Sequence, residues 1–123
     1  MVTKKPPAFP AEVTAVICSW DAEENIEKCL ASLRQNGIGE IILVDANSLD
    51  KTRQIASQFV DKILTDPGDG LARARNIGIQ EATGKYILNF GSDNILLEGS
   101  LEKMLSWLIE KEYSGVSAMT HMK

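Results

Sequence analysis

The stretch VTAVICSWDAEENIEKCLASLRQNGIGEIILVD, residues 13–45, contains two short apolar runs separated by a segment with helical periodicity. Residues 13–18 and 41–44 are nearly continuous apolar runs, which is the pattern of strands that are covered on both faces. Between them, apolar side chains recur at helical spacing, at Ile26, Cys29, Leu30 and Leu33. A strand, a helix and a second strand in this order predict a parallel pair joined by a right-handed crossover.

Local signals predict where this first helix begins and ends. Asp21 followed by Glu24 resembles a capping box, in which the Asp side chain accepts a hydrogen bond from a free amide of the first turn. Gly37 is a natural end for the helix.

The same alternation continues along the chain. Ser48 is a candidate cap for a helix with an apolar face made by Ile55, Ala56, Phe59 and Val60. Lys62–Thr65 is a weaker strand, Asp66–Gly70 is a tight loop, and a helix from Gly70 to about Gly84 carries Leu71, Ala74, Ile77 and Gly78 on one face. The remaining predicted elements are a strand over Tyr86–Phe90, a helix capped by Ser100, and the start of another strand over Val116–Thr120.

These segments predict an α/β fold, with an open, mostly parallel sheet sandwiched by helices in a Rossmann-like arrangement. Residues 1–10 hold three of the four prolines and read as an extended arm. Residues 11–123 then form one α/β domain, a size that a single core can support.

Composition excludes several classes of function. The 123 residues carry a net charge of -4 and show no basic stripe, so we expect no nucleic-acid partner. No apolar run approaches the roughly 20 residues of a transmembrane helix, and residues 1–10 lack the apolar segment of a signal peptide. Cys18 and Cys29 match no metal-binding spacing, which favours two reduced core thiols and a cytoplasmic location.

Polar, acid-containing loops follow each predicted strand. Ligands of open parallel sheets bind outside the carboxyl ends of the strands, so these loops are the candidate site. Asp45 and Asp93 each follow an apolar strand, and two carboxylates at one edge can hold a hard divalent cation. The alternative is that an Asp only caps a turn. The two readings are balanced for Asp45, whereas the run Ser92-Asp93-Asn94, with no helix directly after it, favours function.

The segment GLARARNIG, residues 70–78, begins a helix whose free amides suit an anionic group. Arg73 and Arg75 lie about 200° apart around an ideal helix, so only one of them can face a bound phosphate or ribose. The other would be solvated or paired with Asp50 or Glu81. Solvated arginines on an amphipathic helix are the alternative for both.

Aromatic and histidine residues add one further candidate. Trp20 follows the first strand, where its ring can stack on a nucleobase or pack under the neighbouring loop, and the residues alone favour packing. Trp107 fits the core or a partner surface better. His121 is the only histidine and lies near the end of the chain, which argues against histidine acid–base chemistry, and no phosphate-binding glycine motif of known type is present.

Taken together, five motifs in order resemble glycosyltransferase family 2, the inverting group with the GT-A fold. The resemblance covers about Val13 to Thr120. It rests on the opening strand and its acidic continuation (13–26), Cys29-Leu30-Ala31-Ser32-Leu33, the strand and loop 41–50, the segment 70–78, and Gly84-Lys85-Tyr86-Ile87.

This resemblance implies a nucleoside-diphosphate-sugar donor, such as a UDP- or GDP-sugar, an acceptor of unknown identity, and Mg²⁺ or Mn²⁺. Ser19 and Trp20 would line the base pocket, Asp45 would lie beneath the nucleoside, and Arg75 would lie near it. Asp93 would be the metal ligand of the family's DXD motif. The other candidate donor-binding residues are Asp21, Asn47, Gly70 and Ser92.

The chain departs from the family pattern at two positions. Ala46 stands where a second Asp usually contacts the base, and Gly91 stands where the first acid of DXD is expected. The acceptor site and the catalytic base of the family lie beyond the segment where this chain ends, so the resemblance implies a donor-binding half truncated before the acceptor half, and no catalytic base is assigned.

Two rival functions remain. Ala46 and Gly91 favour a non-catalytic nucleotide-binding or interaction module that keeps only the fold. A nucleotidyltransferase is the third reading, but Ser19-Trp20-Asp21 offers neither the Gly-rich loop nor the basic residue of that class. Apolar residues Val116–Met119 would also leave a surface that we expect to favour a homodimer.

Overall fold

The structure, a computed structural model, describes residues 10–110 and contains one parallel four-stranded sheet in the order β3-β2-β1-β4. The strands are β1 (Val13–Ser19), β2 (Glu40–Asp45), β3 (Lys62–Thr65) and β4 (Tyr86–Gly91). All three neighbouring pairs are parallel. The predicted α/β class, with an open parallel sheet between helices, is therefore confirmed.

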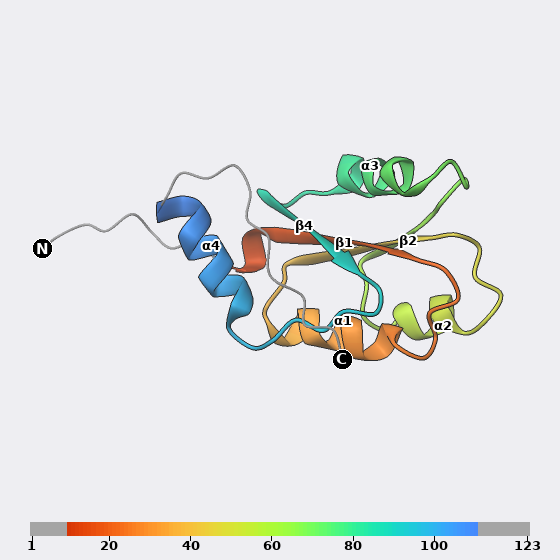
Figure 1. The fold of residues 1–123 in the computed structure, drawn as a ribbon, viewed down its shortest axis with the longest axis horizontal. Coiled ribbons are helices and arrows are strands. Elements are labelled where there is room, and N and C mark those ends of the chain that lie inside the picture. The colour runs from red at the N-terminus through yellow and green to blue at the C-terminus, as the bar shows by residue number, and fades with distance from the viewer. Residues whose placement is uncertain (1–9, 111–123) are drawn as a thin grey trace, which may run out of the picture.

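Helices cover both faces of the sheet (Figure 1). The elements outside the sheet are η1 (Pro10–Glu12), α1 (Ile26–Gln35), α2 (Thr52–Ala56), α3 (Leu71–Glu81) and α4 (Ser100–Glu110). Figure 1 shows α3 on one face of the sheet, with α1 and α2 on the opposite face. Because β1 and β2 lie between these layers, their side chains are almost all buried.

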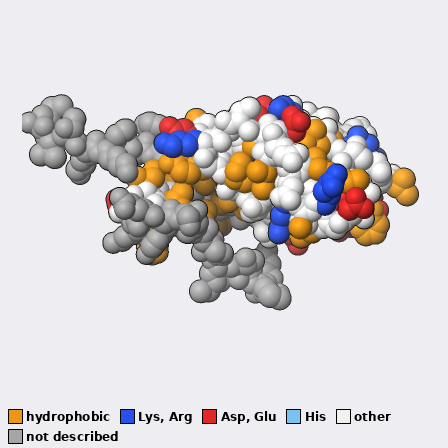
Figure 2. Space-filling view, turned by 90° about the horizontal axis from the view of Figure 1, so that it is seen from above, with side chains coloured by type: hydrophobic (Ala, Val, Ile, Leu, Met, Phe, Trp, Pro, Cys, Tyr) orange, Lys and Arg blue, Asp and Glu red, His pale blue; other side chains and the backbone are white. Residues whose placement is uncertain are grey.

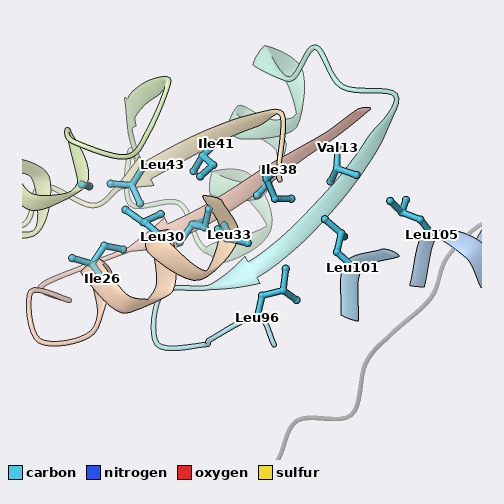
Figure 3. Close-up of a cluster of buried hydrophobic side chains, with 13 residues drawn as sticks. Val13, Ile26, Leu30, Leu33, Ile38, Ile41, Leu43, Leu96, Leu101 and Leu105 are labelled. Atoms are coloured by element: carbon cyan, nitrogen blue, oxygen red, sulfur yellow. The ribbon is translucent and has the colours of Figure 1, made fainter. Parts of the chain in front are cut away.

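The larger core lies on the α1 face of the sheet. Leu30 and Leu33 of α1 point toward Leu43 and Ile41 of β2, and α4 adds apolar side chains at one end (Figure 3). Alternate residues of each strand supply this face because successive side chains of a strand point to opposite sides. The periodic apolar positions of the sequence therefore form the core as predicted.

A smaller core joins α3 to the other face. It contains Val16, Ile42, Val44 and Ala74. Gly78 of α3 lies so close to the sheet that an added Cβ would be 2.4 Å from the Cγ1 atom of Val16. The glycine therefore sets the distance at which α3 packs on β1 and β2.

The predicted helix caps were wrong. α1 begins at Ile26 with Asn25 as its N-cap, so Asp21 lies outside the helix, and its carboxylate accepts a hydrogen bond from the Leu49 amide. Ser48 lies before α2, which starts at Thr52 and ends at Ala56, short of Phe59 and Val60.

The third proposed cap, Ser100, is the first residue of α4, and its hydroxyl donates to the Leu97 carbonyl. At all three positions the side chain makes a bond within or between loops in place of a helix cap. Short polar side chains favour such local bonds as readily as caps, which is why spacing alone misassigned them.

Some predictions lie outside the described residues. These are residues 1–9 of the arm predicted over residues 1–10, the strand start at Val116–Thr120 with its expected dimer surface, and His121. Pro10, the last residue of the predicted arm, begins η1. Within residues 10–110, every helix is too short or too polar to cross a lipid bilayer.

Candidate functional site

A hollow opens between α3 and the carboxyl ends of β1 and β4, with a volume of about 210 Å³. Its lining consists of Val16, Cys18, Leu71, Arg75, Phe90, Gly91, Ser92 and Asp93. Figure 2 shows the face of the molecule that carries α3, where hydrophobic side chains lie among scattered charges of both signs. The hollow lies at the carboxyl edge of the sheet, where the sequence analysis predicted the candidate site.

Three elements build the hollow. Val16 and Cys18 are alternate residues of β1, so both face α3. The first half of α3 contributes Leu71 and Arg75, one turn apart on the helix. The end of β4 and the turn after it contribute Gly91, Ser92 and Asp93. Side chains from distant parts of the sequence therefore meet, because the carboxyl ends of β1 and β4 lie beside the first half of α3.

The hollow carries both signs of charge, because Arg75 and Asp93 line it together. Asp93 is exposed, as expected for a carboxylate that a ligand or cation can reach. Arg73 does not line the hollow, so the structure separates the two arginines as their spacing predicted. Glu81, one of the proposed partners for the second arginine, instead lies 3.6 Å from the Lys62 ammonium.

The two cysteines differ in their surroundings. Both are free thiols, with Cys29 buried and Cys18 half-buried. Burial raises the pKa of the Cys18 thiol, although the positive charge of Arg75 opposes this. Burial raises the pKa of Cys29 to about 12, and the negative charge of Asp93 adds to the shift. Both thiols are therefore protonated and poorly nucleophilic at neutral pH. Cys29 lies in the core as predicted, whereas Cys18 is only half-buried and lines the hollow.

Asp45 occupies a different position from Asp93. Its side chain is 1% exposed and lies on the α1 face of the sheet, where it meets Ser19 of β1. Ser19 donates a hydrogen bond to Oδ1 at 2.8 Å, and Arg53 Nε lies 3.8 Å from Oδ2. Asp45 does not line the hollow, and within residues 10–110 no group of three His, Cys, Asp or Glu side chains is arranged to hold a metal ion. Asp45 thus lies among protein donors on the α1 face, outside the hollow that Asp93 lines.

The loop after β1 and the loop after β2 are joined by hydrogen bonds. The Asp21 amide donates to Ser48 Oγ at 2.8 Å, and the Leu49 amide donates to the Asp21 carboxylate at 2.9 Å. The Ala22 amide donates to Thr52 Oγ1 at 2.7 Å. We call this set of contacts between residues 21–23 and 48–52 the loop clasp.

A second pair of bonds completes the loop clasp. The Glu23 amide donates to Asp50, and the Lys51 amide donates to the Glu23 carboxylate at 3.1 Å. Asp50 also accepts hydrogen bonds from the backbone amide and the hydroxyl of Thr52. Burial favours a higher pKa for Asp50, but these hydrogen bonds outweigh it and lower the pKa.

Trp20 lies next to the loop clasp and is 68% exposed. The prediction that its ring packs under the neighbouring loop, which the residues alone favoured, is therefore wrong. Asn47, on the opposite loop, is exposed and has a φ of 52°, in the left-handed region that Asn tolerates better than most residues.

Gly70 begins α3 with a φ of 100° and a ψ of 165°, a conformation that is essentially restricted to glycine. An added Cβ at Gly70 would meet nothing within 4 Å. The residue is therefore required for the direction of the backbone, which brings the first turn of α3 to the hollow.

Ala46 and Gly91 occupy the two positions where the chain departs from the resemblance. The Ala46 amide donates to the Ser19 carbonyl, so the loop after β2 stays in register with β1 for one more residue. At Gly91 an added Cβ would be 2.9 Å from Asn94 Nδ2 and 3.2 Å from Asp93 Oδ1. Both neighbours are ends of side chains that can move, so the backbone does not forbid a side chain here.

Sequence reasoning missed four residues of the hollow, namely Val16, Cys18, Leu71 and Phe90. Cys18 was assigned to the core because it ends an apolar run. The signal that could have found it is strand alternation, since Cys18 shares its face with Val16 and not with Ser19.

Comparison with known proteins gives a consistent result. The sequence model of the family described as "Glycosyl transferase family 2" matches residues 14–122. An uncharacterized glycosyltransferase of Haemophilus influenzae is 35% identical over 104 residues, which is 80% of this chain and 39% of that protein. The Escherichia coli UDP-Glc:alpha-D-GlcNAc-diphosphoundecaprenol beta-1,3-glucosyltransferase WfgD is 30% identical over 108 residues, which is 83% of this chain and 43% of that protein. The chain thus spans less than half the length of these two relatives.

Solved structures agree on the fold. The mannosyltransferase PcManGT from Pyrobaculum calidifontis, in complex with GDP-Man and Mn²⁺, aligns with a TM-score of 0.72 at 21% identity, over 85% of this chain and 36% of that one. Residues 1–349 of S. aureus TarS, in complex with UDP-GlcNAc, align with a TM-score of 0.71 at 21% identity, over 81% of this chain and 32% of that one.

Proposed function

Because this chain belongs to glycosyltransferase family 2, we propose that it forms the donor-binding part of an inverting glycosyltransferase. The donor is a nucleoside-diphosphate sugar, of the UDP or GDP type, and a divalent cation, Mg²⁺ or Mn²⁺, accompanies it. The acceptor and the catalytic base remain unassigned. The single observation that carries the proposal is the hollow in which Arg75 and Asp93 meet at the carboxyl edge of a parallel sheet.

The charge of the hollow suits a diphosphate that carries a cation. Arg75 offers a guanidinium to a phosphate or ribose oxygen, and the first turn of α3 presents free backbone amides nearby. At about 210 Å³ the hollow is smaller than the roughly 300–1,000 Å³ of a typical ligand pocket, so it holds a part of the donor. The rest of the donor would extend over the loops after β1 and β2.

The residues of the hollow fit a cation that is shared with the substrate. Among residues 10–110, Asp93 is the only carboxylate that lines it, and Ser92 adds a hydroxyl beside it. Mg²⁺ is commonly held by one or two carboxylates together with substrate phosphates and water. When bound, the cation would supply Lewis-acid stabilisation of the leaving nucleotide's charge. Asp93 would hold and orient it from the β4 side.

The remaining candidates have roles on the other side of the site. We assign Trp20 to stacking on the nucleobase, since its ring is exposed beside the loop clasp. Ser19, Asp21, Asn47 and Gly70 would shape the pocket through their loops.

A second candidate function is a nucleotide-binding or interaction module without catalytic activity. Two observations favour it: Ala46 and Gly91 remove two side chains that the family pattern expects. Such a module would bind nucleotides weakly, and Mn²⁺ would not change its affinity.

Calorimetric titration of the chain with UDP and with GDP, each with and without Mn²⁺, separates the two functions. The donor-site proposal expects micromolar binding that requires Mn²⁺ and is lost in Asp93→Ala. Glu98→Ala, which removes an exposed acid a few residues away in the same loop, is the matched control and should bind as the wild type does. Absence of binding to either nucleotide under all conditions would refute the proposal and leave the interaction module.

A further inference from the structure

We infer that Asp45 and Ser48 are positioning residues, which hold Trp20 at the rim of the site through hydrogen bonds and do not touch the ligand. This inference rests on the proposed function for the nature of the ligand. The positioning itself is a property of the free protein. Asp45 therefore acts through its hydrogen bonds to the protein and not through direct contact with the nucleoside.

The carboxylate of Asp45 already has several protein partners. Oδ1 accepts hydrogen bonds from Ser19 Oγ at 2.8 Å and from Ser48 Oγ at 2.6 Å. Oδ2 accepts one from the Ser48 amide at 2.9 Å and faces Arg53 Nε at 3.8 Å, which is an ion pair and not a hydrogen bond. A carboxylate has about four acceptor positions, so these three hydrogen bonds and the ion pair leave little capacity for a ligand. With 1% exposure, Asp45 is also closed to solvent.

Ser48 transmits the position of Asp45 to the loop after β1. Its hydroxyl donates to Asp45 and accepts from the Asp21 amide at 2.8 Å. Since the Asp21 amide is part of the peptide bond that follows Trp20, a continuous path of hydrogen bonds runs from the buried carboxylate to the backbone of Trp20. A hydroxyl can act as donor and acceptor at once, which is the property this position uses.

The loops after β1 and β2 each contain a left-handed residue, and this is why the path of hydrogen bonds is needed. Asp21 has a φ of 43° and Asn47 a φ of 52°, two left-handed conformations that side-chain-bearing residues adopt at a cost. Without fixed partners, the segment Ser19–Ala22 would return to commoner backbone angles. The backbone of Trp20 would then move, because it lies directly before the left-handed residue.

The test uses the intrinsic fluorescence of Trp20 in a Trp107→Phe background, where Trp20 is the one tryptophan left. Ser48→Ala removes the bridging hydroxyl, whereas Ser48→Thr keeps it. Ser57→Ala is the matched control, because the Ser57 hydroxyl donates within its own turn, to the Gln54 carbonyl. Ser48→Cys, which keeps the shape but donates weakly, replaces Ser48→Ala if that variant does not fold.

We expect Ser48→Ala to lower the fluorescence anisotropy of Trp20 and to raise its quenching by iodide, with Ser48→Thr and Ser57→Ala close to wild type. In titrations with UDP and Mn²⁺, we expect Ser48→Ala to weaken binding about five- to tenfold, the effect of losing one hydrogen bond. Unchanged anisotropy and quenching in a folded Ser48→Ala protein would overturn the inference. Changed emission without any nucleotide binding by the wild type would uphold the positioning and refute the proposed donor function instead.

Discussion

The contact between Gly78 and the sheet gives a prediction whose size follows from the structure. In Gly78→Ala the new Cβ would lie 2.4 Å from Val16 Cγ1 and 3.1 Å from Val44 Cγ2. Carbon atoms pack best at about 3.5–4.0 Å, so α3 must move away from the sheet by more than about 1 Å or the valines must change rotamer. Insertion of a methyl group into a packed core costs about 1–3 kcal/mol.

Part of this cost is offset by the helix. Alanine is favoured over glycine in a helix interior by about 1 kcal/mol. An approach of 2.4 Å is a severe overlap, so the upper part of the packing range, about 2–3 kcal/mol, applies, and we expect Gly78→Ala to lower the free energy of unfolding by a net of about 1–2 kcal/mol. With an m-value of about 2 kcal/mol/M, the urea midpoint should fall by roughly 0.5–1 M.

Urea denaturation followed by tryptophan fluorescence measures this shift, and a second substitution tests its cause. Val16→Ala removes both γ-methyl groups, including Cγ1, which collides with the new Cβ, so the double variant should be more stable than the sum of the single effects by at least about 0.5 kcal/mol. A Gly78→Ala protein as stable as the wild type, or a double variant with purely additive effects, would show that Gly78 does not set the packing distance of α3.

Three further predictions concern the site and the charged groups. Gly91→Asp should strengthen Mn²⁺ binding, measured by calorimetry, because a second carboxylate would join Asp93; unchanged affinity would contradict a metal position at the end of β4. Burial favours a higher pKa for Asp61, but hydrogen bonds from the Ile41 amide and Arg34 outweigh it and lower the pKa. The stability that Asp61 contributes is therefore present above its unfolded pKa of about 3.9 and is lost as the pH falls through the lower folded pKa. Asp61→Asn should be less stable than the wild type in urea at pH 7, and the difference in stability should shrink near pH 3. Burial closes Cys29 to reagents and raises the pKa of its thiol to about 12. Its reaction with a disulfide reagent at pH 8 should therefore occur only as fast as the protein opens. A rate like that of a free thiol would contradict its burial.

The strands and the layers of helices could be predicted because apolar periodicity reports burial. Lys62–Thr65 was predicted with its observed bounds, and the other strands differ by one or two residues. The caps failed because Asp21, Ser48 and Ser100 have equally good partners in loops. Which partner a short polar side chain takes depends on tertiary contacts that spacing does not encode.

The candidate site was predicted in outline and not in detail. Parallel topology brings the loops after β1, β2 and β4 to one edge, as predicted, and Arg75 and Asp93 line one hollow there. It could not distinguish Asp45 from Asp93, since both follow apolar strands. The difference arises from the face of the sheet on which each side chain lies and from the donors that surround Asp45.

The position of β1 at the centre of the sheet has a practical consequence for protein engineering. Its consecutive residues serve two separate compartments: Val16 and Cys18 line the hollow, whereas Ala15 and Ile17 belong to the core on the α1 face. Because Val16 is also buried against α3, a combinatorial library restricted to Cys18 could search for altered binding in the hollow while Ala15, Val16 and Ile17 keep the core intact. A library that randomised the whole strand would lose most of its members to unfolding before any selection for binding began.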